Sequence, residues 1–188
     1  RALSNAVEVA LSVKQPREIH GPLGIAMEEV ELEFAAPPSR EELLKRKETG
    51  NKYEQSHAIR LLNQHDERGG IQTSYAFPLQ VIQFGNDLTL AAICGETVVD
   101  YSLRLQQELK SGNGNSHEQE PVVWVAGYSN YVFGYLPSLR VLKEGGYEGN
   151  RAMIYTSYPG PFAESVEQRV VSKIKDLAAQ ARMSTQQK

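Results

Sequence analysis

The chain has 188 residues, a mass of 20.9 kDa and a formal net charge of −3 at neutral pH. With 40% hydrophobic and 23% charged residues, its composition is typical of one soluble globular domain and excludes collagen-like or largely disordered chains. At this length, folding buries roughly 70% of the surface of the unfolded chain, so a core forms without crosslinks. A mildly acidic chain lacks the positive field that holds a polyanion, and we expect no nucleic-acid partner.

Signals for targeting and redox compartment are few. No apolar run approaches the roughly 20 residues of a membrane helix, which predicts no transmembrane segment. Cys94 is the sole cysteine, so an internal disulfide is excluded and the redox compartment stays open. The chain opens on Arg1 within a segment already patterned for structure, which favours a piece of a longer protein.

A helix and then a strand are predicted at the start of the chain. Apolar residues at helical spacing predict an amphipathic helix over residues 2–13, which needs a surface to pack against. Apolar residues alternating with Glu predict a strand over residues 24–34, and the alternation slips once near Glu28 and Glu29.

Residues 39–68 are predicted to form a polar helical excursion. Ser39 and Glu42 fit a capping box, which starts a charged helix after a Pro-Pro break. A second predicted helix over residues 53–65 ends before a Gly-Gly pair. We expect a solvated pair of helices.

The centre of the chain carries the strongest strand signals. Two apolar runs over residues 79–84 and 88–93 flank a Gly-Asn-Asp turn and predict an antiparallel hairpin. A helix over residues 99–109, a polar loop over 111–120 and a buried strand over 122–126 are predicted to follow.

Strands and helices interleave to the end of the chain. The sequence therefore predicts an α/β fold with a mixed β-sheet, at least one antiparallel hairpin and helices packed on the sheet, in a single domain over residues 1–188. The elements expected after Pro137 are a short helix, a Gly-rich turn over 145–149, a strand near 153–155, a helix over 162–181 and a flexible tail over 183–188.

Chemistry is expected where strand ends open into loops. Glu96 follows Gly95 at the end of a predicted strand, where its carboxylate is a ligand, a base, or simply a charge stabilised by the dipole of the next helix. The tyrosine-rich loop over residues 127–135 either lines a pocket or packs against the sheet. The residue pattern leaves these alternatives open.

Other candidates for chemistry are weaker. Ser129 lacks the closing glycine and the following helix of a hydrolase nucleophile elbow. The four histidines show no metal-ligand spacing, and we expect them to be solvated or locally bonded. Cys94 ends an apolar strand and is expected to be buried rather than nucleophilic.

Four short motifs resemble the neutral/alkaline non-lysosomal ceramidase family. They are FGNDLTL at residues 84–90, GE at 95–96, GYSNYVFGY at 127–135 and GGYEG at 145–149. Their order and spacing are similar to those in the C-terminal part of that family's catalytic domain. The resemblance therefore implies that residues 1–188 are a fragment of a larger ceramidase-like catalytic domain.

The resemblance implies a zinc-dependent amidase that hydrolyses the N-acyl bond of ceramide, a lipid amide. The family's zinc is held by two His, a Glu and a Tyr, and the resemblance places the last two on Glu96 and Tyr135. Carboxylate and phenolate oxygens suit this borderline metal, and a bound cation would lower the pKa of the Tyr135 phenol. Gly95, Asn130 and Tyr131 are the candidate pocket-lining residues beside these ligands.

The family's histidine ligands and catalytic serine lie in segments N-terminal to this chain. The resemblance thus implies the N-terminal half of the same domain as a partner, an isolated chain without activity, and a parent that is exported. Cys94 stands where the family usually has proline, and Thr97-Val98-Val99 keeps its threonines only in part, which leaves the substrate open. The alternatives are a related metal hydrolase of another N-acyl or ester substrate, and a non-catalytic binding or structural module.

Overall fold

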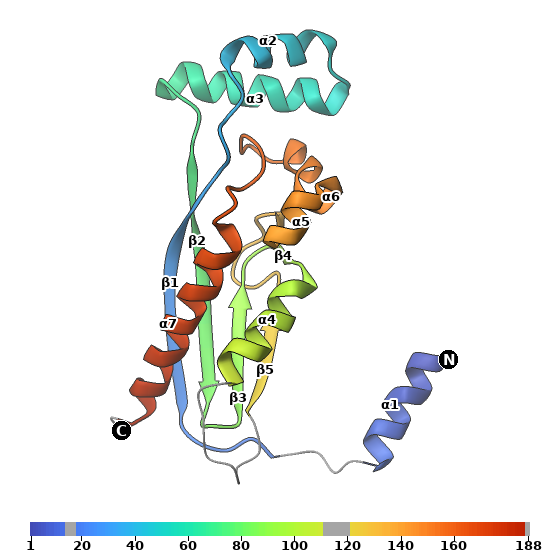
Figure 1. The fold of residues 1–188 in the computed structure, drawn as a ribbon, viewed down its shortest axis with the longest axis vertical. Coiled ribbons are helices and arrows are strands. Elements are labelled where there is room, and N and C mark those ends of the chain that lie inside the picture. Colours follow the sequence, from blue (N-terminus) through green and yellow to red (C-terminus); the bar gives the residue numbers. More distant parts are fainter. Residues whose placement is uncertain (14–17, 111–120, 187–188) are drawn as a thin grey trace.

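A computed structural model of the chain describes residues 1–13, 18–110 and 121–186. A four-stranded sheet forms its centre, in the order β1-β2-β3-β5 (Figure 1). The first three strands are antiparallel neighbours, and β5 runs parallel to β3. This mixed sheet with helices packed on it confirms the predicted α/β class and the predicted hairpin. The strands are β1 (Leu23–Glu33), β2 (Ser74–Phe84), β3 (Leu88–Ile93) and β5 (Val122–Ala126).

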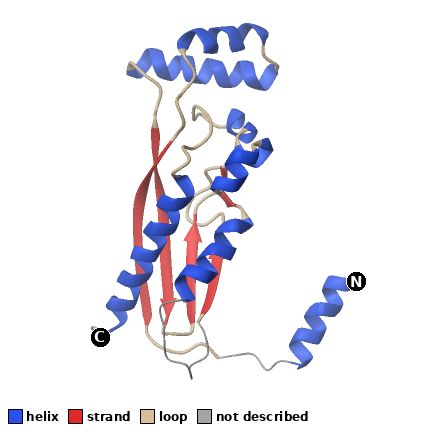
Figure 2. Cartoon of the chain, in the orientation of Figure 1, coloured by secondary structure: helices blue, strands red, loops and turns tan. Residues whose placement is uncertain are grey.

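Two long helices cover one face of the sheet (Figure 2). α7 (Val166–Gln186) contacts β1 and β2, and α4 (Val99–Lys110) contacts β5. The main core lies between these helices and the sheet, and its fully buried side chains include Leu79, Tyr101 and Ile174. No helix in the described part of the chain is long and apolar enough to cross a membrane.

The excursion beyond the end of the sheet is a helical hairpin of α2 (Arg40–Thr49) and α3 (Lys52–Arg68) (Figure 1). The predicted capping box is confirmed, because the Glu42 N–H donates to Ser39 Oγ at 3.2 Å and the Ser39 N–H donates to Glu42 Oε2 at 2.7 Å. The hairpin thus begins as its sequence predicts. It folds around a small core of its own, which consists of Leu43, Ala58, Leu61 and Leu62.

The first helix, α1 (Ala2–Val13), stands apart from the sheet in Figure 1. It forms over the predicted residues, and none of its side chains is buried. Leu3 and Leu11 expose 80% and 71% of their surface. Within the described residues, the apolar side of α1 therefore stays uncovered.

The slip in the apolar alternation near Glu28 does not interrupt the pairing of the first strand. β1 pairs with β2 residue for residue along its whole length, without a bulge. The alternation changes because apolar residues occupy both faces of β1, while Glu28 lies on the face toward α7. There its carboxylate accepts hydrogen bonds from Lys173 at 2.9 Å and from Gln180 at 2.8 Å. An acidic residue on the helix-covered face therefore needs no bulge.

The prediction of a strand near residues 153–155 is wrong. This segment ends a 3-10 helix, η1 (Arg151–Tyr155), in which the Met153 N–H donates to the Asn150 carbonyl at 3.0 Å. Local turn hydrogen bonds thus satisfy a backbone that the apolar pattern assigned to a sheet. The short elements before it are α5 (Leu139–Glu144) and α6 (Gly146–Gly149), where a short helix and a turn were predicted.

Several further features of burial and of element boundaries differ from the predictions, including the start of β2 at Ser74 rather than at residue 79. The strand expected to be buried, β5, exposes 50% of Val122 and 62% of Trp124, because no described element covers that face. The last helix begins at Val166 rather than at residue 162, because Phe162 forms an antiparallel bridge with Phe34. It continues past residue 181 to Gln186, so residues 183–186 of the predicted tail are helical. Residues 187–188 and the predicted loop over 111–120 lie outside the described residues.

Candidate functional site

Glu96 and Tyr135 lie opposite each other in a short parallel pair of strands. β4 (Glu96–Thr97) and β6 (Tyr135–Leu136) form this pair at the ends of β3 and of the tyrosine-rich loop. The Glu96 N–H donates to the Gly134 carbonyl at 2.6 Å. Residues directly opposite in a sheet point to the same face. The structure therefore brings the two candidate ligands side by side.

Two phenols converge on the Glu96 carboxylate. The Tyr128 hydroxyl donates a hydrogen bond to Glu96 Oε2, and the Tyr135 phenol lies close enough to the Glu96 carboxylate for its pKa to respond to it. Because a carboxylate acceptor stabilises the protonated phenol, it raises the pKa of Tyr128 and raises that of Tyr135 to about 12. Without a cation, this cluster therefore keeps both phenols protonated around one carboxylate.

Unusual backbone conformations hold this cluster together. Gly95 has φ +75°, and a Cβ atom there would lie 2.6 Å from the Gly134 carbonyl oxygen. Tyr128 and Asn130 have φ +54° and +65°, which side chains other than glycine rarely adopt. The Tyr128 N–H donates to the Gly95 carbonyl at 2.7 Å. Strained residues of this kind persist where the surrounding structure holds them, which is common at functional sites.

The GGYEG motif supplies a third tyrosine. Tyr147 of α6 packs edge-on against Tyr135, with ring centroids 5.4 Å apart. A Cβ at Gly149 would lie 2.6 Å from the Val141 carbonyl oxygen, so glycine lets this turn pack against α5. Sequence reasoning did not place Tyr128 or Tyr147 beside the predicted ligands. Their places in the motifs GYSNYVFGY and GGYEG were the sequence signal that could have found them.

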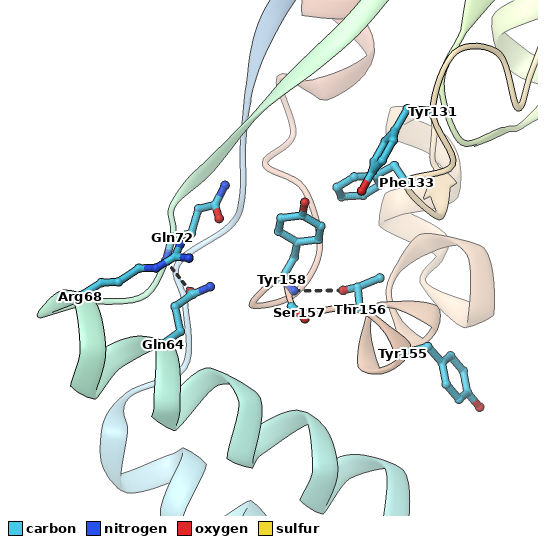
Figure 3. Close-up of a pocket in the computed structure, with 9 residues that line it drawn as sticks. All are labelled: Gln64, Arg68, Gln72, Tyr131, Phe133, Tyr155, Thr156, Ser157 and Tyr158. Atoms are coloured by element: carbon cyan, nitrogen blue, oxygen red, sulfur yellow. Dashed lines mark hydrogen bonds between the residues drawn. The ribbon is translucent and has the colours of Figure 1, made fainter.

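A cavity of about 400 Å³ opens between α3, the tyrosine-rich loop and the segment after η1 (Figure 3). Gln64 and Arg68 of α3 lie across from Tyr131 and Phe133, and Tyr158 lies between them (Figure 3). The lining combines amide, guanidinium and phenol groups with aromatic rings. Tyr155, which also lines the cavity, has its ring centroid 6.4 Å from that of Tyr147. Aromatic contacts thus connect the cavity wall with Tyr135.

The three residues predicted to line a pocket occupy different positions. Tyr131 lines this cavity. The Asn130 side-chain amide instead donates to Gln80 Oε1 at 3.1 Å, and the Gly95 N–H donates to the Tyr131 carbonyl at 2.9 Å. Gly95 therefore shapes the loop through its backbone.

The weaker candidates take structural roles. Cys94 is fully buried, as predicted, and burial raises the pKa of its thiol to about 12, which makes it unreactive at neutral pH. The Ser129 hydroxyl donates to the carbonyls of Ala126 and Gly127. His20 and His65 lie within 3.2 Å and 3.5 Å of neighbouring carboxylates, and His117 lies outside the described residues.

His57 and Arg60 attach α3 to the cavity wall. His57 is buried and its Nε2 lies 2.7 Å from the Tyr158 carbonyl oxygen, so the prediction of solvated or locally bonded histidines is wrong for this residue. The Arg60 guanidinium donates to the carbonyls of Ile154 at 2.7 Å and Thr156 at 3.1 Å. The position of the α2–α3 hairpin therefore depends on these two side chains.

Acidification should destabilise the chain through His57, because burial lowers the pKa of its imidazole. The unfolded chain then binds more protons than the folded chain, so this contribution to stability is complete above about pH 6.5 and declines below it. We expect the thermal unfolding midpoint of the wild type to fall more steeply from about pH 7.5 to 5 than that of His57→Gln. His65→Gln, at a partly exposed histidine of the same helix, should keep the wild-type slope. Equal slopes in all three proteins would contradict the prediction.

The residues present fit one side of a metal site. Glu96 offers a carboxylate, and Tyr135 offers a phenol that becomes a ligand when its proton is displaced. Zinc sites take three or four protein ligands, usually with imidazole or thiolate among them. Among the residues that the structure describes, no three His, Cys, Asp or Glu side chains are grouped to hold an ion. The described part of the chain therefore supplies an incomplete ligand set.

Fold and site together define a mixed α/β unit with an oxygen-donor cluster at its strand ends. No family model and no curated protein matches the sequence. Among solved structures, the chain is similar to the crystal structure of neutral ceramidase from Pseudomonas aeruginosa, with a TM-score of 0.57 and 16% sequence identity. The likeness covers 96% of this chain and 31% of that one. The chain therefore has a ceramidase-like fold and spans less than a third of the ceramidase's length.

Proposed function

We propose that the chain is the C-terminal portion of a zinc-dependent, ceramidase-like amidase and contributes Glu96 and Tyr135 as metal ligands. The observation that carries the proposal is the in-register pairing of these two residues, which places the Tyr135 phenol beside the Glu96 carboxylate. The ceramidase-like fold of the chain supports the assignment. The substrate is ceramide or a related lipid amide, cleaved at its N-acyl bond.

Each residue of the cluster has a distinct part in this site. Glu96 supplies the negative charge, and Tyr128 orients its carboxylate through the hydrogen bond to Oε2. Tyr135 keeps its proton beside Glu96 until a cation displaces it, and Tyr147 limits the positions of its ring. When bound, zinc supplies a Lewis acid that polarises a carbonyl and lowers the pKa of a coordinated water.

The remaining ligands come from the N-terminal half of the same catalytic domain. The chain matches 31% of the length of the ceramidase structure, which supports a larger parent protein. The two histidine ligands and the catalytic serine that the resemblance implies would lie in that half. The isolated chain is therefore expected to be inactive.

A second candidate is a related metal hydrolase whose N-acyl or ester substrate has a polar head group. The cavity beside the site favours it, because Gln64, Arg68 and Gln72 contribute amide and guanidinium groups to the lining. An aliphatic groove would suit a lipid chain better than such a surface does.

Zinc content and N-acylsphingosine hydrolysis of the full-length protein test the proposal. We expect about one zinc per chain, and we expect Tyr135→Phe to weaken zinc binding at least roughly tenfold, because a ligand oxygen is removed. Tyr53→Phe is the matched control, since Tyr53 lies on α3 and is 55% exposed. It should retain zinc and activity.

The outcomes separate the candidate functions. Zinc without cleavage of ceramide would keep the site and favour the polar-substrate hydrolase. A full-length protein that binds no zinc would overturn the metal site and favour a non-catalytic module.

A further inference from the structure

The face of the sheet opposite α4 and α7 is open and apolar. Pairing registers place three rows of four residues on it, because directly paired residues share a face. We call these twelve residues the open sheet face. The rows are Leu23-Phe84-Leu88-Val122, Ile25-Ile82-Leu90-Trp124 and Met27-Gln80-Ala92-Ala126.

Large apolar side chains on this face are exposed to solvent. Ile25 and Met27 each expose 52% of their surface, Val122 exposes 50% and Trp124 exposes 62%. Gln80 is the single polar residue in the three rows. A sheet with one solvated face usually alternates apolar and polar residues, whereas this one is apolar on both faces. Contiguous exposed apolar surface of this kind marks an interaction site.

Polar groups mark the limits of the apolar surface. Beyond the third row, the same face of β1 carries Glu29 and Glu31. At the third row itself, Gln80 accepts a hydrogen bond from the Asn130 amide. Asn130 lies two residues from Tyr128, which donates to Glu96. The open sheet face therefore borders the loop of the candidate metal site.

We propose that the open sheet face is the docking surface for the remainder of the ceramidase-like domain, which completes one core from both sides. This inference rests on the proposed function for the identity of its occupant. The chain covers 31% of the similar ceramidase structure, so most of that length lies outside this chain. An apolar layer over the three rows would also reach the Tyr128 loop, where the remaining ligands are needed.

A second copy of the chain is the competing occupant. Two copies joined through this face would bury Trp124 but would leave the ligand set at Glu96 incomplete. They would also leave unexplained the exposed apolar side of α1, which precedes β1. The rest of the domain accounts for both exposed surfaces and for the incomplete site with one partner.

Cysteine accessibility in the full-length protein tests the docking surface. Met27→Cys places a thiol on the open sheet face, and Leu103→Cys places one on the outer side of α4; the native side chains are 52% and 57% exposed in this chain. If the face is covered, a maleimide probe should label Met27→Cys at least about tenfold more slowly than Leu103→Cys, with equal rates in denaturant. Peptide mass spectrometry separates these sites from the buried Cys94. Ile25→Cys provides a second position on the same face.

Labelling rates within about twofold of each other would overturn the proposal. Protection of Met27→Cys that is lost when the full-length protein is diluted would replace it with a dimer joined through this face. The readout needs neither zinc nor activity. A protected face in a zinc-free protein would therefore overturn the zinc site of the proposed function and leave the open sheet face as a covered surface. A labelled face in a zinc-containing protein would overturn only the docking surface.

Discussion

Replacing Gly95 with alanine should lower the free energy of unfolding by about 3 kcal/mol. The residue has φ +75°, which an alanine adopts only at a cost of about 1–2 kcal/mol. Its Cβ would lie 2.6 Å from the carbonyl oxygen of Gly134, which must then move. That carbonyl accepts the Glu96 N–H, so the movement would also disturb the pairing of Glu96 with Tyr135.

Denaturant unfolding of the chain measures this effect, with Gly70→Ala as the control. Gly70 has no positive φ, and no heavy atom lies within 4 Å of its ideal Cβ position. The control should stay within about 1 kcal/mol of the wild type, with any gain arising from a less flexible unfolded chain. A Gly95→Ala variant as stable as the control would show that the turn tolerates a side chain.

Replacing Glu96 with glutamine in the full-length protein should remove zinc and lower kcat/KM at least about 100-fold. Loss of a hydrogen-bond partner of a metal ligand already costs about 10–100-fold, and here a ligand's charge is lost. Glutamine keeps the shape of the side chain and an acceptor oxygen for Tyr128. The pKa of Tyr135 should also fall toward its ordinary value, because the carboxylate that raises it is gone.

Glu164→Gln is the matched control for this substitution. Glu164 is 71% exposed and lies 3.5 Å from Lys143, a surface pair of little energetic consequence. Glu164→Gln should keep its zinc and unfold within about 0.5 kcal/mol of the wild type, so a loss of zinc confined to Glu96→Gln reports on the Glu96 carboxylate. If Glu96→Gln retained zinc at wild-type affinity, Glu96 would not be a ligand.

Short-range chemistry in the sequence predicted most of the helices and strands. Capping, turn residues and hydrophobic periodicity act between residues a few positions apart, so they can be recognised without the fold. The capping box at Ser39 and the turn between β2 and β3 both formed as predicted. The motifs at residues 95–96 and 127–135 also identified the segments that carry Glu96 and Tyr135, although the residue pattern alone left their roles open.

Long-range contacts decided the remainder. The helix-covered face accommodates Glu28 because Lys173 and Gln180, near the far end of the chain, donate hydrogen bonds to its carboxylate. The cluster around Glu96 forms because β4 pairs with β6 and a loop with positive φ angles turns Tyr128 toward the carboxylate. Such contacts join segments that are distant in sequence, so no local pattern encodes them. By itself the sequence determined the position of the main helices and strands and the residue types they present, whereas only the tertiary structure decided their boundaries, which side chains meet and which face of the sheet is exposed.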